Sequence, residues 1–359
     1  MALDELYIYN LNFEKIAIID NAESVIWTER FDECGDFEIY MRAEAEIMRL
    51  LTHEKFACYV THRDSDMVGL IEKYTVEMDD EQNQHVIISG RCAVSLLSRR
   101  VIANQEDFKD KYASDIINEL ILNNIIESSV AARNIDRLQY VYNISNADTV
   151  PQITGNYFGK NLYECVVELC RTYGYGIKSR MAQIPVGGTT KLGISISLYQ
   201  GVDRTGTGGL APVTFALEYD NLQQSTYSDS EIEYVNAALV SDSGDTPPYL
   251  ATTFAGSGVG IRRKEIYVEL KNVKYRDYQS NYEYIWRNYG NQELAKYHYS
   301  GTFDAQANSV GTYEYKKHYN LGDRVAIATD YGYTTYATVT EVTACLDDTG
   351  YHLTPKLKF

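Results

Sequence analysis

The clearest pattern in the chain is an alternation of apolar and polar residues through Phe37-Glu38-Ile39-Tyr40-Met41. Such an alternation places the apolar side chains on one face of an extended strand and the polar side chains on the other. The acidic stretch just before it contains Gly35, which can adopt the positive φ of a tight turn. Trp27 and Phe31 flank this turn. The segment therefore predicts a hairpin corner in a β-domain.

Residues 1–100 continue in the same way. Short runs rich in β-branched and aromatic residues are separated by polar turns, as in an antiparallel meander. They predict strands at 6–9, 15–19, 24–27, 37–41, 56–61, 67–78 and 85–90, with a short helix at 43–51. We expect these strands to form a small barrel-like domain.

Residues 101–185 change to helical periodicity. From Ala113, apolar residues recur at intervals of three and four, which predicts an amphipathic helix. A second helix is expected to begin after Asn161, with Glu164 completing a capping box, and to end at Gly174. A strand is expected at 175–179. This part is predicted to be a helical or mixed α+β section.

Residues 186–359 return to strands interrupted by glycine-rich connections. Strands are predicted at 192–199, 213–219, 231–240, 311–315, 324–329, 333–343 and 351–359, and a tyrosine-rich helix at about 275–299. The sequence thus predicts a mostly β, α+β protein. A first β-domain is separated by the helical section from a second β-domain, and the second domain contains the inserted helix.

Tyrosine is unusually abundant, with 32 residues against 10 Phe and 2 Trp. Tyrosine joins a large apolar ring to a polar tip and is enriched at interfaces. The tyrosine-rich helix therefore predicts an interface formed by Tyr278, Tyr282, Trp286 and Tyr289.

The formal net charge of −17 argues against stable binding of a nucleic-acid backbone, which needs a basic surface. Basic clusters such as Arg262-Arg263-Lys264 and Lys316-Lys317 are expected to face protein partners or the outside. No apolar run is long enough to span a membrane, and the acidic N-terminus does not resemble a signal peptide. Six cysteines without a Cys-x-x-Cys motif indicate buried thiols in a reducing compartment.

Motifs for catalysis are scarce. His62, with Asp64 and Asp66, could hold a cation, but a polar hairpin tip is the simpler interpretation. Asp348-Thr349-Gly350 matches an aspartic-protease triplet yet lies between two predicted strands, as a hairpin turn does. The glycine tract at 256–260 precedes a strand rather than a helix, unlike a dinucleotide loop. We predict no catalytic residue, metal or cofactor, and no enzyme activity.

Several short motifs follow one another in an order that resembles a known family. They are Gly35-Asp36-Phe37-Glu38, Gly69-Leu70-Ile71-Glu72, Gly90-Arg91, Leu96-Leu97, Arg99-Arg100, Gly290 to Leu294, Tyr319 to Val325 and Thr340-Glu341-Val342. This order is similar to that of the tail-hub proteins of long-tailed bacteriophages, also called baseplate-hub or tail-associated proteins, which include the siphovirus Gp37-like family. The resemblance covers most of the chain and is loosest at 181–260.

The resemblance implies a structural baseplate or tail-hub protein of a phage or phage-tail-like particle. It also implies the tail-hub fold, in which two small antiparallel β-barrel-like domains of shared fold stand on either side of the helical section. It implies a homotrimeric ring that joins the hexameric tail tube to spike, tail-fibre or other distal tail proteins, and that lets DNA pass without binding it. The protein would reside in the virion tail after assembly in the host bacterial cytoplasm. Because the chain ends after the last hub strand, a lytic domain is expected on another polypeptide. Two alternatives remain open: a tail-associated cell-wall hydrolase, and a receptor- or glycan-binding module of the tail tip.

Overall fold

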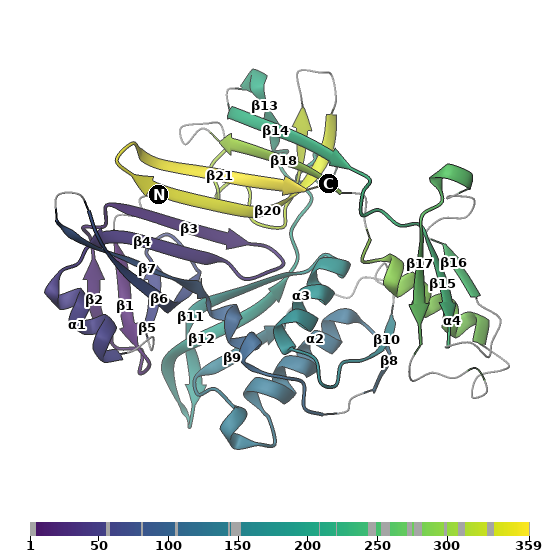
Figure 1. Ribbon diagram of the computed structural model, residues 1–359, viewed down its shortest axis with the longest axis horizontal. Coiled ribbons are helices and arrows are strands. Elements are labelled where there is room, and N and C mark those ends of the chain that lie inside the picture. The colour runs from purple at the N-terminus through teal and green to yellow at the C-terminus, as the bar shows by residue number, and fades with distance from the viewer. Residues whose placement is uncertain are drawn as a thin grey trace.

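The protein is mostly β, and its α-helices lie in three places: beside the N-terminal strands, in the middle section and in a small unit at one end (Figure 1). The computed structural model describes residues 5–54, 58–79, 82–104, 107–142, 144, 152–207, 209–219, 221–242, 249–252, 259–270, 275, 282–297, 300–307, 313–328 and 334–358.

The N-terminal strands follow one another in an antiparallel arrangement, as the alternation predicts. They are β1 (Leu6–Asn10), β2 (Lys15–Ile19), β3 (Ser24–Arg30), β4 (Asp36–Arg42), β5 (Cys58–His62), β6 (Val68–Met78) and β7 (Gln84–Cys92), with helix α1 (Ala45–Glu54) after β4 and a 3₁₀ helix η1 (Ala93–Arg99) after β7. Their order in the sheet is β3-β4-β7-β6-β5-β1-β2. The alternating residues of β4 point as expected, since Phe37, Ile39 and Met41 are all buried.

The C-terminal strands continue the same sheet. They are β13 (Thr214–Ala216), β14 (Leu222–Ser230), β18 (Ser300–Ala307), β19 (Arg324–Ala328), β20 (Thr334–Asp347) and β21 (Gly350–Lys358), with a 3₁₀ helix η4 (Leu217–Tyr219) after β13. Strand β20 pairs with β3 in the register Glu341↔Arg30 to Leu346↔Val25, and it also pairs with β21 and β19. Strands from the N-terminal and C-terminal parts of the chain therefore lie side by side (Figure 1).

This pairing changes the predicted architecture. The described strands form no closed barrel, because β3 pairs with β20 instead of returning to β2, and the resulting sheet stays open with β2 and β14 at its ends. The two barrel-like domains of the prediction are thus joined in one sheet of 13 strands. The predicted boundary at 100/101 falls just after η1, and the boundary at 185/186 falls at the end of a strand, just before the hairpin turn at 187–188. The three-domain division stays a prediction.

The middle section packs beneath the N-terminal sheet. It contains β8 (Asp107–Lys111), α2 (Ala113–Ile121), a π-helical turn η2 (Leu122–Ile126), a 3₁₀ turn η3 (Ala131–Arg133), β9 (Leu138–Tyr142), β10 (Ile153–Asn156), α3 (Leu162–Tyr173), β11 (Gly176–Val186) and β12 (Thr189–Tyr199). Its apolar side chains merge with those of β1 to β7 in one hydrophobic core. The N-terminal sheet and the helices consequently support each other.

Helix α3 begins and ends as the sequence predicts. The Asn161 side chain accepts hydrogen bonds from the backbone N–H groups of Tyr163 and Glu164, and Gly174 ends the helix at a left-handed φ of 70°. Gly35 differs from its prediction, because it does not adopt a positive φ. A Cβ atom at this position would lie 2.2 Å from the Thr28 carbonyl oxygen, so space rather than conformation requires glycine.

A smaller unit stands apart at one end of the molecule (Figure 1). Strands β15 (Ala237–Ser241), β16 (Tyr249–Thr252) and β17 (Glu265–Glu269) form a sheet against helix α4 (Tyr282–Leu294), and η5 (Gly260–Arg262) is a short 3₁₀ turn before β17. The described helix is shorter than the predicted 275–299. Parallel pairing of β15 with β17 and the strands β14 and β18 were not expected from the sequence.

Candidate functional site

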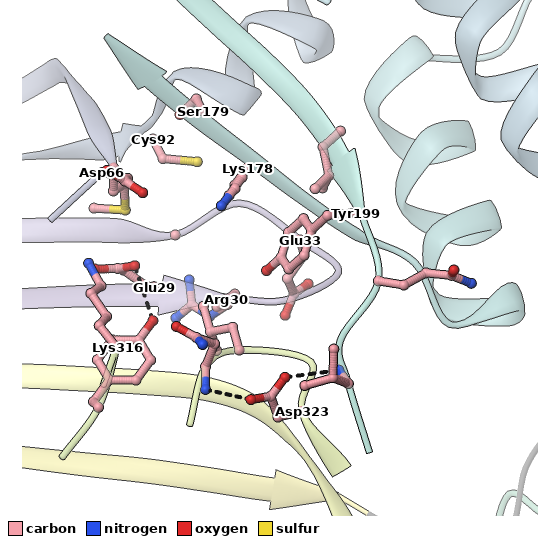
Figure 2. A pocket seen from close by; sticks show the side chains of 18 of the residues that line it. Glu29, Arg30, Glu33, Asp66, Cys92, Lys178, Ser179, Tyr199, Lys316 and Asp323 are labelled. Carbon is pink, nitrogen blue, oxygen red and sulfur yellow. Dashed lines mark hydrogen bonds and ion pairs between the residues drawn. The ribbon is translucent and has the colours of Figure 1, made fainter. Parts of the chain in front are cut away.

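The most extensive meeting of distant segments surrounds a cavity of about 510 Å³ (Figure 2). Its walls come from β3 with the turn that follows it, from β11 with the segment 199–204 after β12, and from the loop 315–323. These segments are far apart in sequence. The cavity therefore marks the place where the N-terminal, middle and C-terminal parts of the chain are fastened together.

Glu29 is the first of three charged centres in this region. Its carboxylate accepts hydrogen bonds from the Ser65 hydroxyl at 2.8 Å, the Lys316 Nζ at 3.0 Å and the Tyr315 hydroxyl at 3.2 Å. Ser65 in turn accepts a hydrogen bond from the buried Trp27 indole. Burial, together with the nearby Glu29, raises the pKa of Tyr315 well above its ordinary value, so this phenol remains a hydrogen-bond donor.

Asp323 is the second centre and is almost completely buried, with a side-chain exposure of 3%. One oxygen accepts from the Val202 N–H, and the other accepts from Arg204 Nε and the Asn320 N–H, all at 2.9 Å. The carboxylate thus ties segment 199–204 to the loop before β19. Backbone hydrogen bonds between Arg324 and residues Val202 and Arg204 extend this junction.

Arg30 is the third centre and joins the two ends of the chain. Its guanidinium donates to Asp36 on β4, to Glu341 on β20 and to the Cys34 carbonyl oxygen. Burial by itself would lower the pKa of Arg30, but the hydrogen bonds to the two carboxylates raise it above its ordinary value. Arg30 therefore stays charged and holds β3, β4 and β20 in register.

Several charged side chains that line this cavity contact other residues of its lining. Lys316 pairs with Glu29, Arg204 with Asp323, and Lys178 lies over the ring of Tyr199 at 5.0 Å (Figure 2). In the part of the chain that the structure describes, no group of three His, Cys, Asp or Glu side chains is arranged to hold a metal ion. These contacts can fix the relative orientation of the three segments that line the cavity.

A larger groove of about 890 Å³ runs between the β3–β4 turn, helix α3 and the ends of β20 and β21. Arg171 on α3 donates to Asp32 at 3.2 Å and to Glu33 at 3.0 Å on one side of it. Lys296, after α4, pairs with Glu168 on α3 at 2.6 Å. This groove is thus spanned by ion pairs that link α3 to its neighbours.

The predicted tyrosine interface divides into separate environments. Tyr278 lies outside the described residues. Trp286 is fully buried in the core of the small unit, and Tyr282 and Tyr289 are partly buried around it, with Tyr282 in edge-to-face contact with Trp286 at 6.1 Å. Part of the aromatic surface is therefore used within this chain, and its role in an interface stays a prediction.

Other residues considered from the sequence have local roles. His62 is buried, and its Nδ1 accepts a hydrogen bond from the Asp64 N–H in the turn after β5. Among the described residues, His62 belongs to no group of side chains arranged to hold a metal ion. The turn Asp347–Gly350 connects β20 to β21, as the hairpin interpretation predicts. The glycine tract at 256–260 is described only from 259 onwards. Lys316 turns inward to Glu29 rather than outward.

Sequence reasoning missed the three charged centres. In the sequence, Asp323 is recognisable only as the last residue of a turn. Glu29 and Arg30 are recognisable only as polar residues beside the predicted hairpin at Gly35. Their partners are supplied by segments as much as 311 residues away, as between Arg30 and Glu341. No local motif signals such contacts.

The whole architecture has counterparts among solved structures. A tail protein from Neisseria meningitidis MC58 superimposes with a TM-score of 0.55 at 13% identity, over 99% of this chain and 96% of that one. The 43 kDa tail protein of prophage MuSo2 from Shewanella oneidensis gives 0.55 at 12% identity, over 98% and 97%. Prophage tail protein gp18 from Listeria monocytogenes EGD-e gives 0.55 at 11%, over 99% and 94%. The chain thus has the fold of these tail proteins.

The sequence itself gives a more specific assignment. The model of the siphovirus ReqiPepy6 Gp37-like protein family matches residues 5–357. The chain belongs to this family, in agreement with the resemblance seen in its motifs. A comparison with curated proteins finds no match. Among the described residues, no helix is long and apolar enough to cross a membrane.

Proposed function

We propose that this chain is a structural hub protein of a phage tail or baseplate. In this proposal three copies form a ring that joins the tail tube to the spike or tail-tip proteins, and the ring is located in the virion tail after assembly in the host cytoplasm. The observation that carries the proposal is the match with solved tail proteins over nearly the full length of both chains. Membership of a siphovirus family supports the same setting.

The junction around the cavity supports a mechanical role. A hub transmits force between partners, so its parts must keep a fixed orientation. Arg30, Glu29 and Asp323 connect the N-terminal, middle and C-terminal parts of the chain through hydrogen-bonded ion pairs. We therefore propose a structural rather than an enzymatic function, with no cofactor requirement. DNA would pass through the ring without stable binding, in keeping with the net charge of −17.

The oligomeric mass of the purified protein tests this proposal. Native mass spectrometry is expected to give about 122 kDa for the protein alone, three times the chain mass of 40.8 kDa, or a complex with three copies of the chain after addition of the tail-tube protein. A monomer under both conditions would contradict the ring.

The enzymatic alternative is tested on the same sample. Purified protein incubated with isolated cell walls is expected to release no soluble fragments. Release of fragments, abolished by heating the protein, would favour a tail-associated hydrolase.

A further inference from the structure

We infer that Cys34 and Cys92 are a redox-modification site, which closes into a disulfide bond when the protein meets a peroxide oxidant. The inference goes beyond the proposed function, because it concerns the chemistry of the single chain. All six cysteines are free thiols in the structure, and five of them are buried.

The strand pairing brings these two cysteines together. Asp36 lies opposite Arg91 in the β4–β7 pair, and the Cys92 N–H donates to the Gly35 carbonyl oxygen at 2.8 Å just beyond it. Cys34 and Cys92 are therefore diagonal neighbours across adjacent strands. Their sulfur atoms are 2.9 Å apart, within an ångström of the S–S bond length of about 2.05 Å. To form the bond, the two sulfur atoms must approach each other by about 0.9 Å.

The surroundings hold this pair in place. The Cys34 N–H donates to the Tyr163 hydroxyl on α3 at 3.0 Å, and the Cys34 thiol also lies 3.3 Å from the Cys92 carbonyl oxygen. Gly35 cannot be replaced by a larger residue without meeting the Thr28 carbonyl oxygen. These contacts place the Cys34 thiol against Cys92.

The cavity gives a small oxidant access to one of the sulfurs. Cys92 and Gly35 line the cavity of about 510 Å³, and Cys92 is seen at its edge in Figure 2. The neighbouring Cys92 sulfur and burial raise the pKa of Cys34. Burial opposes ionisation of Cys92, yet its hydrogen bond with Cys34 lowers its pKa. Because Cys92 lines the cavity, its sulfur is the one that a small oxidant reaches first.

The reaction balances with hydrogen peroxide as the oxidant. The Cys92 thiolate attacks one peroxide oxygen, which breaks the O–O bond, forms a sulfenic acid and releases hydroxide that takes up a proton to become water. Cys34 then attacks the Cys92 sulfur, loses its proton and displaces the sulfenic oxygen as a second water. In total, two thiols and one peroxide give one disulfide and two waters.

The disulfide would close a loop between residues 58 positions apart and would tie the start of β4 to the end of β7. Such a link stabilises the folded protein by restricting the unfolded chain. If the proposed function holds, a particle assembled in a reducing cytoplasm would gain this stabilisation after release. That biological consequence depends on the proposed function, while the chemistry does not.

The test uses the full chain, treated with equimolar hydrogen peroxide and compared with the dithiothreitol-reduced protein. Denaturing alkylation is expected to leave four of the six thiols reactive, and peptide mapping to find Cys34 linked to Cys92. The oxidised protein is expected to melt at a higher temperature, by on the order of 5 °C. Cys34→Ser should abolish both effects. The control Cys345→Ser should retain them, since Cys345 is the most exposed cysteine and contacts Asp347 instead.

Free thiols at Cys34 and Cys92 in the oxidised wild-type protein would overturn the inference, as would their separate conversion to sulfinic acids. A temperature shift that persists in Cys34→Ser would also overturn it. Mapping of the wild-type protein decides the question even if a variant does not fold. A monomeric protein that forms the Cys34–Cys92 bond would refute the proposed trimeric ring but not this inference. A trimer that does not form the bond would refute this inference but not the ring.

Discussion

Replacement of Asp323 by alanine should destabilise the protein far more than replacement of any exposed aspartate. The Asp323 carboxylate is 3% exposed and accepts hydrogen bonds from Val202, Arg204 and Asn320. Its removal leaves the Arg204 guanidinium, which is 19% exposed, without the carboxylate that balances its charge. Removal of one partner from a buried ion pair costs about 3–5 kcal/mol.

The same segment provides a matched control. Among the described residues, the Asp203 carboxylate accepts hydrogen bonds from Thr205 and Thr207 alone, both within its own turn. Asp203→Ala therefore removes an equal side chain without breaking the contacts of Asp323. Its cost should be about 1 kcal/mol or less. Asp323→Asn keeps the shape but turns one oxygen into an N–H donor that faces other donors, so it should fall close to Asp323→Ala.

Urea unfolding followed by circular dichroism measures these differences, with the change in free energy taken from the shift in midpoint at constant slope. The account expects Asp323→Ala to lose about 3–5 kcal/mol relative to the wild type. Equal stability of Asp323→Ala and Asp203→Ala would refute the view that the buried carboxylate fastens the junction.

Three further changes test other parts of the structure. Gly90→Ala should destabilise strongly, because a Cβ atom would lie 1.8 Å from a carbonyl oxygen of the neighbouring strand, and a lower melting temperature would show it. Trp286→Ala should cost about 3–5 kcal/mol in urea unfolding, whereas Tyr284→Ala, 62% exposed, should stay within about 0.5 kcal/mol of the wild type. The hydrogen bonds from Arg91 lower the pKa of Glu72 below 4.5, so its stabilisation is present above that pH and disappears as the pH falls through the folded-state pKa. Glu72→Gln should therefore remove part of the acid dependence of the melting temperature, and an unchanged pH profile would contradict this.

Local chemistry explains which elements could be predicted from the sequence. Asn161 and Gly174 bound α3 as expected, because a helix cap depends on residues within one turn. The alternation in β4 likewise predicts its buried face correctly, because alternation depends only on neighbouring residues of one strand. Strand β14, by contrast, has the sequence LQQSTYSDS. It has too few apolar residues to show the alternation that predicts a strand, and it is recognised from its pairing with β18 in the structure.

Long-range pairing explains what the sequence could not predict. A small barrel was expected at residues 1–100 because their strands form an antiparallel meander, and a second barrel-like domain was expected from the family resemblance. The structure instead joins β3 to β20, a contact that local periodicity does not encode. The candidate site failed to appear for the same reason, since Asp323 acquires its role from residues about 120 positions earlier. A single sequence shows the polarity of such a residue but not its partner.

The central claim is that three copies of this chain form the hub between tail tube and tail tip. Cryo-electron microscopy of assembled tails tests it most directly. The account predicts threefold density at the end of the tube, into which one chain fits in each third with β3 and β20 paired. Absence of the protein from purified tails, or its presence with a different symmetry, would contradict the account.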